Sequence, residues 1–456
     1  MTPVSISAAE AIPGLITLPW HISLEAWPDE LITALPKGIS RHVVRFTTID
    51  GTVVAVKETT PELARSEFDL LKQLVKANIP CVEPLAVVTS RSDSAGESLP
   101  AALITKHLKF SIPFRALYST TLRPETLRRL IDALALLLVR LHNYGFFWGD
   151  VSLSNTLFVR DAGAFAAYLV DAETGRLYPS LTDGQRAHDL EIARVNIAGE
   201  LMDLQAGSRM DESIDPVMIS DRILAAYESL WHALNDPEVL AQHELWKIHE
   251  RVQHLNDLGF DIEELDITTD ESGTTVRIQP KVVDAGHHAR RLLRLTGLDT
   301  EENQARRLLN DLDEYRARVS PTHLDEEVVA HMWLTQVFEP VVTSIPERLE
   351  RKLEDAEVFH QVLEHRWYMS EREKRDVTLE EAVRNYIETV LVNRRDEELL
   401  INPPTGAITA ANRLPTKRQA RKRSSSSKKS MSFGIDDEEP PPRDADEPEV
   451  DWRDLV

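Results

Sequence analysis

Residues 146–158 read FFWGDVSLSNTLF, and this short stretch decides the fold. An aromatic run is followed by Gly149 and Asp150, then by Asn155 five places after the aspartate, and then by a second apolar run. The apolar flanks indicate a loop that is pinned at both ends. Residues of these two polar types can be turn residues that bond their own backbone, or groups that carry out chemistry. Further polar residues elsewhere in the chain decide between these two interpretations.

Composition predicts a cytoplasmic protein with more than one globular unit. At 456 residues and 42% hydrophobic, the chain is long enough for two or three units with proper cores. The single cysteine, Cys81, excludes an intramolecular disulfide framework and fits a reducing compartment. The N-terminus has no positive region before its apolar residues, unlike a signal peptide. The longest apolar stretch, Ala133 to Val139, is far shorter than the ~20 residues of a membrane span.

The charge distribution argues against nucleic-acid binding. The formal net charge is −23, and the segment from Pro403 onward holds ten basic and ten acidic residues. The first 402 residues therefore carry the whole net negative charge of −23. Such a surface repels phosphate backbones, whose neutralisation needs clustered Lys and Arg. An acidic surface that favours solubility is a sufficient explanation.

The first third of the chain is rich in β signals. Short segments at Leu31–Pro36, His42–Phe46 and Thr52–Val56 predict three strands in a meander, with the turn signal IDG before the last of them. A helix follows, with Thr60 suited to its N-cap and Pro61 to its first turn. After a loop that reads RSDSAGES, a further strand is expected at residues 101–105.

The later part of the chain is mostly helical. Helices are expected at residues 124–142 and at about 189–204, and a hairpin is expected where FDIEELDITT and TTVRIQPKVV flank DESG. The tail from 403 is too polar and proline-rich to bury a core, so we expect it to be disordered. The predicted parts are an N-terminal extension at 1–28, a sheet lobe at 29–108, a helical lobe at 109–210, a mostly helical region at 211–402 and a disordered charged tail at 403–456.

Asp150 and Asn155, together with polar residues at the ends of two predicted strands and on one helix, are the types of residue that phosphoryl transfer needs. That reaction needs a lysine for the nucleotide phosphates, a carboxylate for the incoming hydroxyl, and an amide with a second carboxylate for Mg²⁺. Lys57 ends the strand TVVAVKE, and Asp171 closes the strand AAYLVD. Glu67 precedes Leu71 and Leu74 by four and seven places, so it shares their helix face and can pair with Lys57.

These motifs resemble the protein-kinase-like fold over residues 31–204. LHNYGFFWGDVSLSNTLF is similar to the catalytic loop of aminoglycoside and choline kinases and of lipopolysaccharide-kinase-like proteins. VAVKE is similar to the third strand of kinases, EFDLLKQL to the helix of its glutamate partner, and VDAETG to the metal-binding motif. AHDLEIARVNIAGELMDL resembles the next helix, whose aspartate braces the catalytic loop. The stretch from LPWHISLEAWPDE to DAETG looks like an uncharacterised bacterial family that is labelled lipopolysaccharide-kinase-like.

The resemblance implies an α+β architecture with two lobes, a small antiparallel sheet lobe and a helical lobe, followed by the mostly helical region and the tail. It implies ATP and Mg²⁺ as cofactors and assigns one role to each matching residue. The expected phosphate ligand is Lys57 with its partner Glu67, the base is Asp150, the metal ligands are Asn155 and Asp171, and the brace is Asp189. The adenine is expected near residues 105–108, with no residue assigned.

Some positions depart from the protein-kinase pattern. Trp148 replaces the usual histidine and Gly149 the arginine that reads a phosphorylated activation loop. Ser152 replaces a lysine and Glu173 a glycine, and both changes favour the small-molecule branch. The segment KGISRH stands where kinases have a glycine-rich loop over the nucleotide phosphates, but it has one glycine, Gly38, and no second one. Phosphate binding by this segment would rely on its backbone amides.

Two hypotheses of different classes follow. The first is an active Mg²⁺-dependent kinase whose acceptor is a hydroxyl of a sugar, a lipid-linked saccharide, another small molecule or a protein. The second is a pseudokinase, a nucleotide-binding module whose C-terminal region and tail engage a protein partner. Taken singly, each residue has an ordinary structural interpretation, such as a surface lysine or a turn aspartate. The correct order and spacing of five of them favours the first hypothesis. A zinc-protease motif fails because His360 and His365 are five positions apart, which separates them on a helix.

Overall fold

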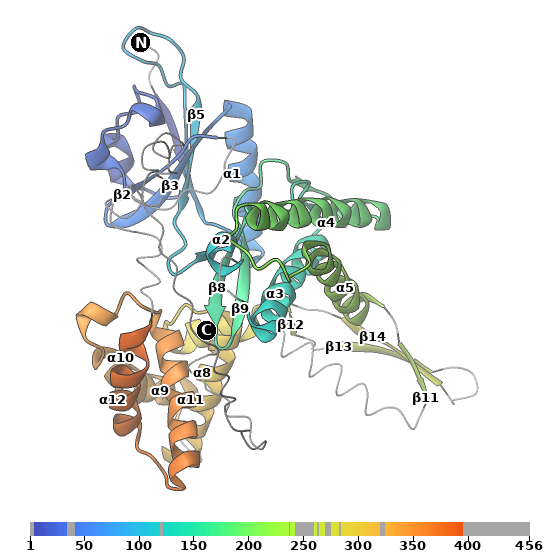
Figure 1. Ribbon diagram of the computed structural model, residues 1–456, viewed down its shortest axis with the longest axis vertical. Coiled ribbons are helices and arrows are strands. Elements are labelled where there is room, and N and C mark those ends of the chain that lie inside the picture. Colours follow the sequence, from blue (N-terminus) through green and yellow to red (C-terminus); the bar gives the residue numbers. More distant parts are fainter. Residues whose placement is uncertain are drawn as a thin grey trace, which may run out of the picture. The chain divides into compact units, whose positions relative to one another are not determined.

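The structure is a computed structural model. It describes residues 4–33, 42–118, 122–236, 286–319 and 324–394, and the backbone of short strands between 238 and 285 (Figure 1). The chain divides into two compact units, Met1–Asn402 and Pro403–Val456. The tail predicted to be disordered lies outside the described residues. In the part of the chain that the structure describes, no helix is long and apolar enough to cross a membrane.

A five-stranded antiparallel sheet forms the first part of the fold. Its strand order is β1-β4-β5-β3-β2. The turn between β2 and β3 is Asp50-Gly51, both with positive φ, which suits the twist of a two-residue hairpin. The strands expected at 52–56 and 101–105 are confirmed as parts of β3 and β5, and the one expected at 42–46 is confirmed from Val44 onward, where β2 begins. The strands are β1 (Ser5–Ala8), β2 (Val44–Ile49), β3 (Thr52–Thr59), β4 (Pro84–Thr89) and β5 (Ala101–Lys106).

The prediction of a strand at Leu31–Pro36 is wrong at its start, because Leu31 belongs to a helix. The chain forms a short 3₁₀ helix, η3 (Asp29–Leu31), preceded by Pro28 in an extended conformation. The fixed φ of proline favours a turn start here, and residues 34–36 lie outside the described part. Two further 3₁₀ helices, η1 (Pro13–Thr17) and η2 (Leu24–Ala26), precede η3. Their apolar residues pack on one face of the sheet, so the segment before residue 28 shares the core of the sheet.

Alternation along β3 divides its side chains between two faces. Val54 and Val56 are buried in the core that includes Trp20 and Trp27. The other face is covered by α1 (Pro61–Lys76), which lies alongside the strands (Figure 1). Thr60 caps this helix as predicted, because its side chain accepts from the backbone N of Leu63. Two neighbouring residues of β3, Lys57 and Glu58, therefore point in opposite directions.

Helices and a central hairpin form the second part. The helix expected at 124–142 is confirmed. The one expected from 189 begins six residues earlier, because Thr182 and Gln185 form a capping box. The elements are β6 (Ile112–Pro113), α2 (Phe114–Tyr118), α3 (Pro124–Asn143), β7 (Phe146–Phe147), β8 (Thr156–Asp161), β9 (Ala164–Leu169), β10 (Arg176–Leu177), α4 (Asp183–Ala206) and α5 (Pro216–Asn235). A sheet followed by helices is consistent with the expected two-lobed, kinase-like α+β fold.

The remaining region is mostly helical, as expected. Its hairpin pairs β13 with β14 in antiparallel register and confirms the one predicted around DESG. The described residues of the first predicted strand belong to β12 and β13. The strands are β11 (Glu238–Ala241), β12 (Phe260–Asp261), β13 (Glu264–Thr269), β14 (Thr275–Lys281) and β15 (Asp284–Ala285). The helices are α7 (His287–Thr296), α8 (Glu302–Val319), α9 (Glu326–Trp333), η5 (Leu334–Phe338), α10 (Glu339–Thr343), η6 (Glu347–Leu349), α11 (Asp355–Glu373), α12 (Leu379–Thr389) and η7 (Leu391–Asn393).

The tip of the β8–β9 hairpin is bonded to this helical region. Asp161 accepts hydrogen bonds from the backbone N of Asn303 and Gln304, at 3.2 and 2.8 Å, in the first turn of α8. The backbone N of Ala162 donates to Glu357 on α11 at 3.0 Å. Asp161 thus acts as an N-terminal cap for a helix that begins 141 residues later in the chain.

Candidate active site

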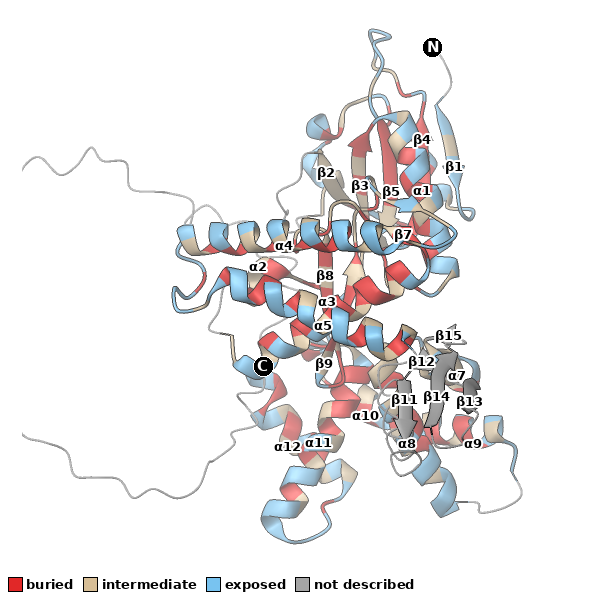
Figure 2. Ribbon diagram, turned by 90° about the vertical axis from the view of Figure 1, so that its right-hand side faces the viewer, coloured by how far each residue is buried: buried red, intermediate tan, exposed pale blue. Residues whose placement is uncertain are grey.

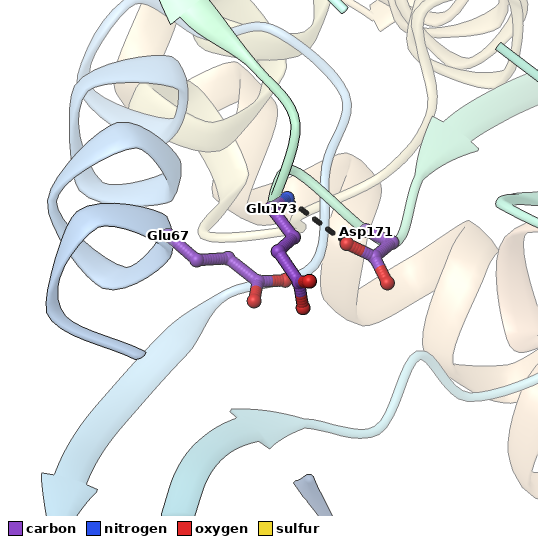
Figure 3. Close-up of side chains that lie close together, drawn as sticks. All are labelled: Glu67, Asp171 and Glu173. Carbon is purple, nitrogen blue, oxygen red and sulfur yellow. Dashed lines mark hydrogen bonds between the residues drawn. The ribbon is translucent and has the colours of Figure 1, made fainter. Parts of the chain in front are cut away.

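Lys57 lies at the centre of an acidic cluster. Its Nζ is 3.0 Å from Glu67 Oε2, 2.8 Å from Asp171 Oδ2 and 3.0 Å from Glu173 Oε2. Glu67 comes from α1, whereas Asp171 and Glu173 follow β9. Figure 3 shows the carboxyl groups of these three residues close together, with the backbone N of Glu173 bonded to Asp171. The structure therefore joins Lys57, Glu67 and Asp171, as the sequence predicted, and adds Glu173.

Burial and neighbouring charges shift the pKa values of Lys57 and Glu67 in this cluster. Burial acts to lower the pKa of Lys57, but the nearby charges of Glu67 and Asp171 outweigh it, so the pKa is raised and the lysine stays charged. Glu67 is 1% exposed. Its burial raises the pKa to about 7, because the opposing effect of Lys57 is smaller and Asp171 adds to the rise. The ion pair between Lys57 and Glu67 is therefore sensitive to pH near neutrality.

The donor set of this cluster fits a divalent cation. Ligand oxygens of Glu67, Asp171 and Glu173 all lie within 4.8 Å of one another. Three carboxyl groups face a single ammonium, and carboxylate oxygens are the donors that Mg²⁺ prefers. Asp171 and Glu173 remain partly exposed, with side-chain exposures of 30% and 20%, so an ion can reach them.

The loop of residues 148–155 lies beside this cluster and holds Asp150. Asn155 donates its amide to the Asp150 backbone O at 3.0 Å and to Asp150 Oδ2 at 3.2 Å. The backbone N of Val170 donates to Asn155 O, so Asn155 is anchored next to the residue that precedes Asp171. The indole Nε1 of Trp148 donates to Asp171 O at 2.8 Å. The structure thus brings Asp150, Asn155 and Asp171 into one network of hydrogen bonds.

Asp189 is fully buried under the start of this loop. Its carboxylate accepts from the backbone N of Trp148 and of Gly149, both at 2.8 Å, and lies 3.2 Å from His142 Nε2. Gly149 has φ of +77°, and a Cβ there would lie 3.2 Å from Thr174 O. This backbone conformation and the close approach explain why glycine occupies the position where protein kinases have arginine.

Besides Glu173, three features of the site were not predicted from the sequence. Asn196 and Glu200 of α4 bond the loop, and the Trp148 indole links the loop to Asp171. A signal for the first two existed, because Asn196 and Glu200 follow Asp189 by seven and eleven positions and so share its helix face.

Two predicted parts of the site have limited structural support. Gly38 and its neighbours up to residue 41 lie outside the described residues. Residues 105–108, expected near the adenine, form the end of β5 and the link that follows. There the backbone N of Lys106 donates to Glu83 O and that of His107 to Val53 O, which ties the link to the sheet.

Two segments of the chain match models of known protein families. Residues 55–198 match the model of the lipopolysaccharide kinase (Kdo/WaaP) family. This match supports the lipopolysaccharide-kinase-like assignment made from the sequence, and with it a kinase-like phosphotransferase. Residues 229–391 match the model of a domain of unknown function, DUF4032.

The solved structures that this chain resembles include one described as WaaP in complex with acyl carrier protein. That similarity has 17% sequence identity and a TM-score of 0.32, and it covers 50% of this chain and 90% of that chain. No curated protein matches this chain.

Proposed function

We propose that this protein is a Mg²⁺-dependent ATP phosphotransferase that transfers the γ-phosphate to a hydroxyl of a sugar, a lipid-linked saccharide or another small molecule. The observation that carries the proposal is the arrangement of Lys57 among Glu67, Asp171 and Glu173, next to a loop that holds Asp150. Catalysis of phosphoryl transfer depends mainly on such positioning and on charge stabilisation.

Each residue has a role that its contacts support. Lys57, oriented by Glu67, binds the nucleotide phosphates. Asp150 accepts the proton of the acceptor hydroxyl as its oxygen bonds to the γ-phosphorus, while the bond from that phosphorus to the β,γ-bridging oxygen breaks and ADP leaves. Asp189 holds the backbone of the loop in place through Trp148 and Gly149.

Asn155, Asp171 and Glu173 would hold the metal ion, with Glu173 added by its place in the acidic cluster. When bound, Mg²⁺ supplies positive charge for the phosphate oxygens. Both Asp171 and Glu173 also contact Lys57, so these carboxylates would be shared between the lysine and the ion.

The acceptor class is supported by the family match, whereas Ser152, at the position where protein kinases have a lysine, serves the loop. The matching family is described as a lipopolysaccharide kinase family, which favours a saccharide hydroxyl. Ser152 is buried and its Oγ accepts from the backbone N of Asn155, so this position stabilises the loop. A protein acceptor, and a protein partner of the C-terminal region or tail, stay predictions.

A second candidate is a nucleotide-binding pseudokinase with little turnover. One observation favours it: the ammonium of Lys57 already forms ion pairs with three carboxyl groups and donates hydrogen bonds to two of them, Glu67 and Asp171. Nucleotide phosphates would have to compete with these groups.

Phosphate transfer from labelled ATP separates the two candidates. Purified protein is incubated with Mg²⁺, labelled ATP and a panel of saccharides, in parallel with Asp150→Asn, Lys57→Met and the control Lys72→Met, whose lysine is exposed on α1. We expect transfer by the wild type and the control, and losses of at least ~100-fold in the two site variants. Equal rates in all four proteins would contradict the proposal. Stabilisation by nucleotide without turnover would identify the pseudokinase.

A further inference from the structure

One face of helix α4 follows the whole loop that carries Asp150. Asp189, Asn196 and Glu200 share this face, and each bonds a successive part of the loop. Asp189 bonds the backbone N of residues 148 and 149, Asn196 bonds residues 150 and 151, and Glu200 accepts from the backbone N of residues 153 and 154 at 2.7 and 3.0 Å. Figure 2 shows α4 exposed along one side and buried along the other.

Asn196 differs from the other two because it contacts a side chain. Its Nδ2 donates to Asp150 Oδ1 at 3.2 Å and to the backbone O of Val151 at 3.1 Å. An amide nitrogen carries two hydrogens, so these two acceptors use both of them. The position of the amide is therefore fixed by the backbone of the loop and by the carboxylate at the same time.

The carboxylate of Asp150 is consequently held at both oxygens by neutral amides. Asn155 bonds Oδ2 at 3.2 Å from within the loop, and Asn196 bonds Oδ1 from the helix. Two donors on different oxygens restrict rotation of the carboxylate about its last bond. A lysine at position 196 would instead form an ion pair with the base, and an acid would repel it.

We infer that Asn196 is a positioning residue that orients the carboxylate of Asp150 toward the acceptor hydroxyl. The inference rests on the proposed function, because it gives Asp150 the role of the base. Orientation of a reacting group is worth a large factor in rate, and a displacement of about 1 Å can cost ~100-fold. Asn196 acts through Asp150 and does not touch the substrate.

Two substitutions separate the donor role from simple packing. Asn196→Asp keeps the shape of the side chain but removes both donors and places a second carboxylate beside Asp150. Asn196→Ala removes the donors without adding charge. The matched control is Gln205→Ala, because Gln205 lies on the same helix and its amide also donates to two backbone carbonyls, at 3.1 and 2.6 Å, away from the loop.

Steady-state kinetics and thermal unfolding give the first test. We expect kcat to fall by about tenfold in Asn196→Ala and by about 100-fold in Asn196→Asp, with KM for ATP within about twofold of wild type. Gln205→Ala should keep its kcat, and the melting temperatures of all three variants should lie close together. An Asn196→Asp variant with wild-type kcat would overturn the inference, and so would a fall in kcat that Gln205→Ala shares.

Crystal structures give a second test that needs no turnover. In Asn196→Ala we expect the Asp150 carboxylate to rotate away from its wild-type orientation, while the backbone at 148–149 stays bonded to Asp189. An unchanged carboxylate would overturn the inference whether or not the protein is active. If the wild type transfers no phosphate, the proposed function fails. The comparison of the wild-type and Asn196→Ala crystal structures would still show whether Asn196 orients the Asp150 carboxylate.

Discussion

Lys57 and Glu58 are neighbours on one strand, yet their surroundings differ in charge balance. On the α1 face, Lys57 contacts three carboxyl groups. On the opposite face, Glu58 forms a buried ion pair with Arg91 at 2.8 Å. Arg91 also donates to the backbone O of Trp20, Ile22 and Pro100, and the backbone N of Leu24 donates to Glu58.

The difference between the two clusters is the balance of positive and negative side chains in each. Around Arg91 one cation meets one carboxylate, and three backbone carbonyls accept from the guanidinium, two of them in the N-terminal segment, so the pair joins that segment to the sheet. Around Lys57 acid is in excess, and two of the three acids are partly exposed. Burial alone does not distinguish a structural from a functional ion pair, whereas the balance of charge does.

The largest effect on stability is expected on the balanced side. Arg91→Met leaves Glu58 buried without its cation, and removal of one partner of a buried pair costs about 3–5 kcal/mol in free energy of unfolding. Urea unfolding monitored by tryptophan fluorescence measures this loss. A double change of Glu58 and Arg91 to Met should recover much of it. A single variant as stable as wild type would contradict the structural role of this pair.

A smaller effect is expected on the acidic side. Lys57→Met leaves Glu67 and Asp171 without the cation that they contact, whereas Glu173 keeps its contact with His42 Nε2 at 2.9 Å. The expected cost is about 2–3 kcal/mol in free energy of unfolding. Here Mg²⁺ should restore part of the stability, because the carboxyl groups can bind the ion in place of the ammonium. Thermal unfolding with and without Mg²⁺ tests this, with Arg91→Met as the control that Mg²⁺ should not rescue. Equal responses of the two variants to Mg²⁺ would remove the distinction between the two clusters.

The smallest effect concerns the pH dependence of Glu67. Its pKa of about 7 in the folded protein lies above the ordinary value of 4.5, so between these values the folded state holds a proton that the unfolded state has released. The stability of the wild type should therefore fall as pH rises through this window, whereas Glu67→Gln lacks this contribution. We expect the variant to gain about 1–2 kcal/mol relative to wild type between pH 5 and pH 8. Urea unfolding at several pH values measures the difference, and a constant difference would contradict the raised pKa.

The sequence predicted those parts of the fold that local signals determine. The cap at Thr60 and the apolar stripe of the next helix were read correctly, because they depend on residues within one or two turns. The helix expected from residue 189 starts six residues earlier, because Thr182 and Gln185 form a capping box before α4. The strand expected at Leu31 failed where Pro28 and the acidic residues after it favour a turn.

The two charged clusters show the same limit. Lys57, Glu67 and Asp171 could be found because strand ends and helix faces have a regular period. Arg91 could not be found, because it begins a loop that looks polar and its partners lie 33 to 71 residues earlier or 9 later in the chain. Contacts of this kind are set by packing between distant segments, and a single sequence carries no local record of them.

The cap that Asp161 forms on α8 has a consequence for how this protein can be divided. Asp161 lies within the region that matches the kinase family, and α8 lies within the region that matches the domain of unknown function. Its burial raises the pKa to about 6, and the donors of residues 303 and 304 offset part of that rise. A cut between the two regions would leave each half with unpaired polar groups on a newly exposed surface. The two regions should therefore melt together and be inherited as a pair.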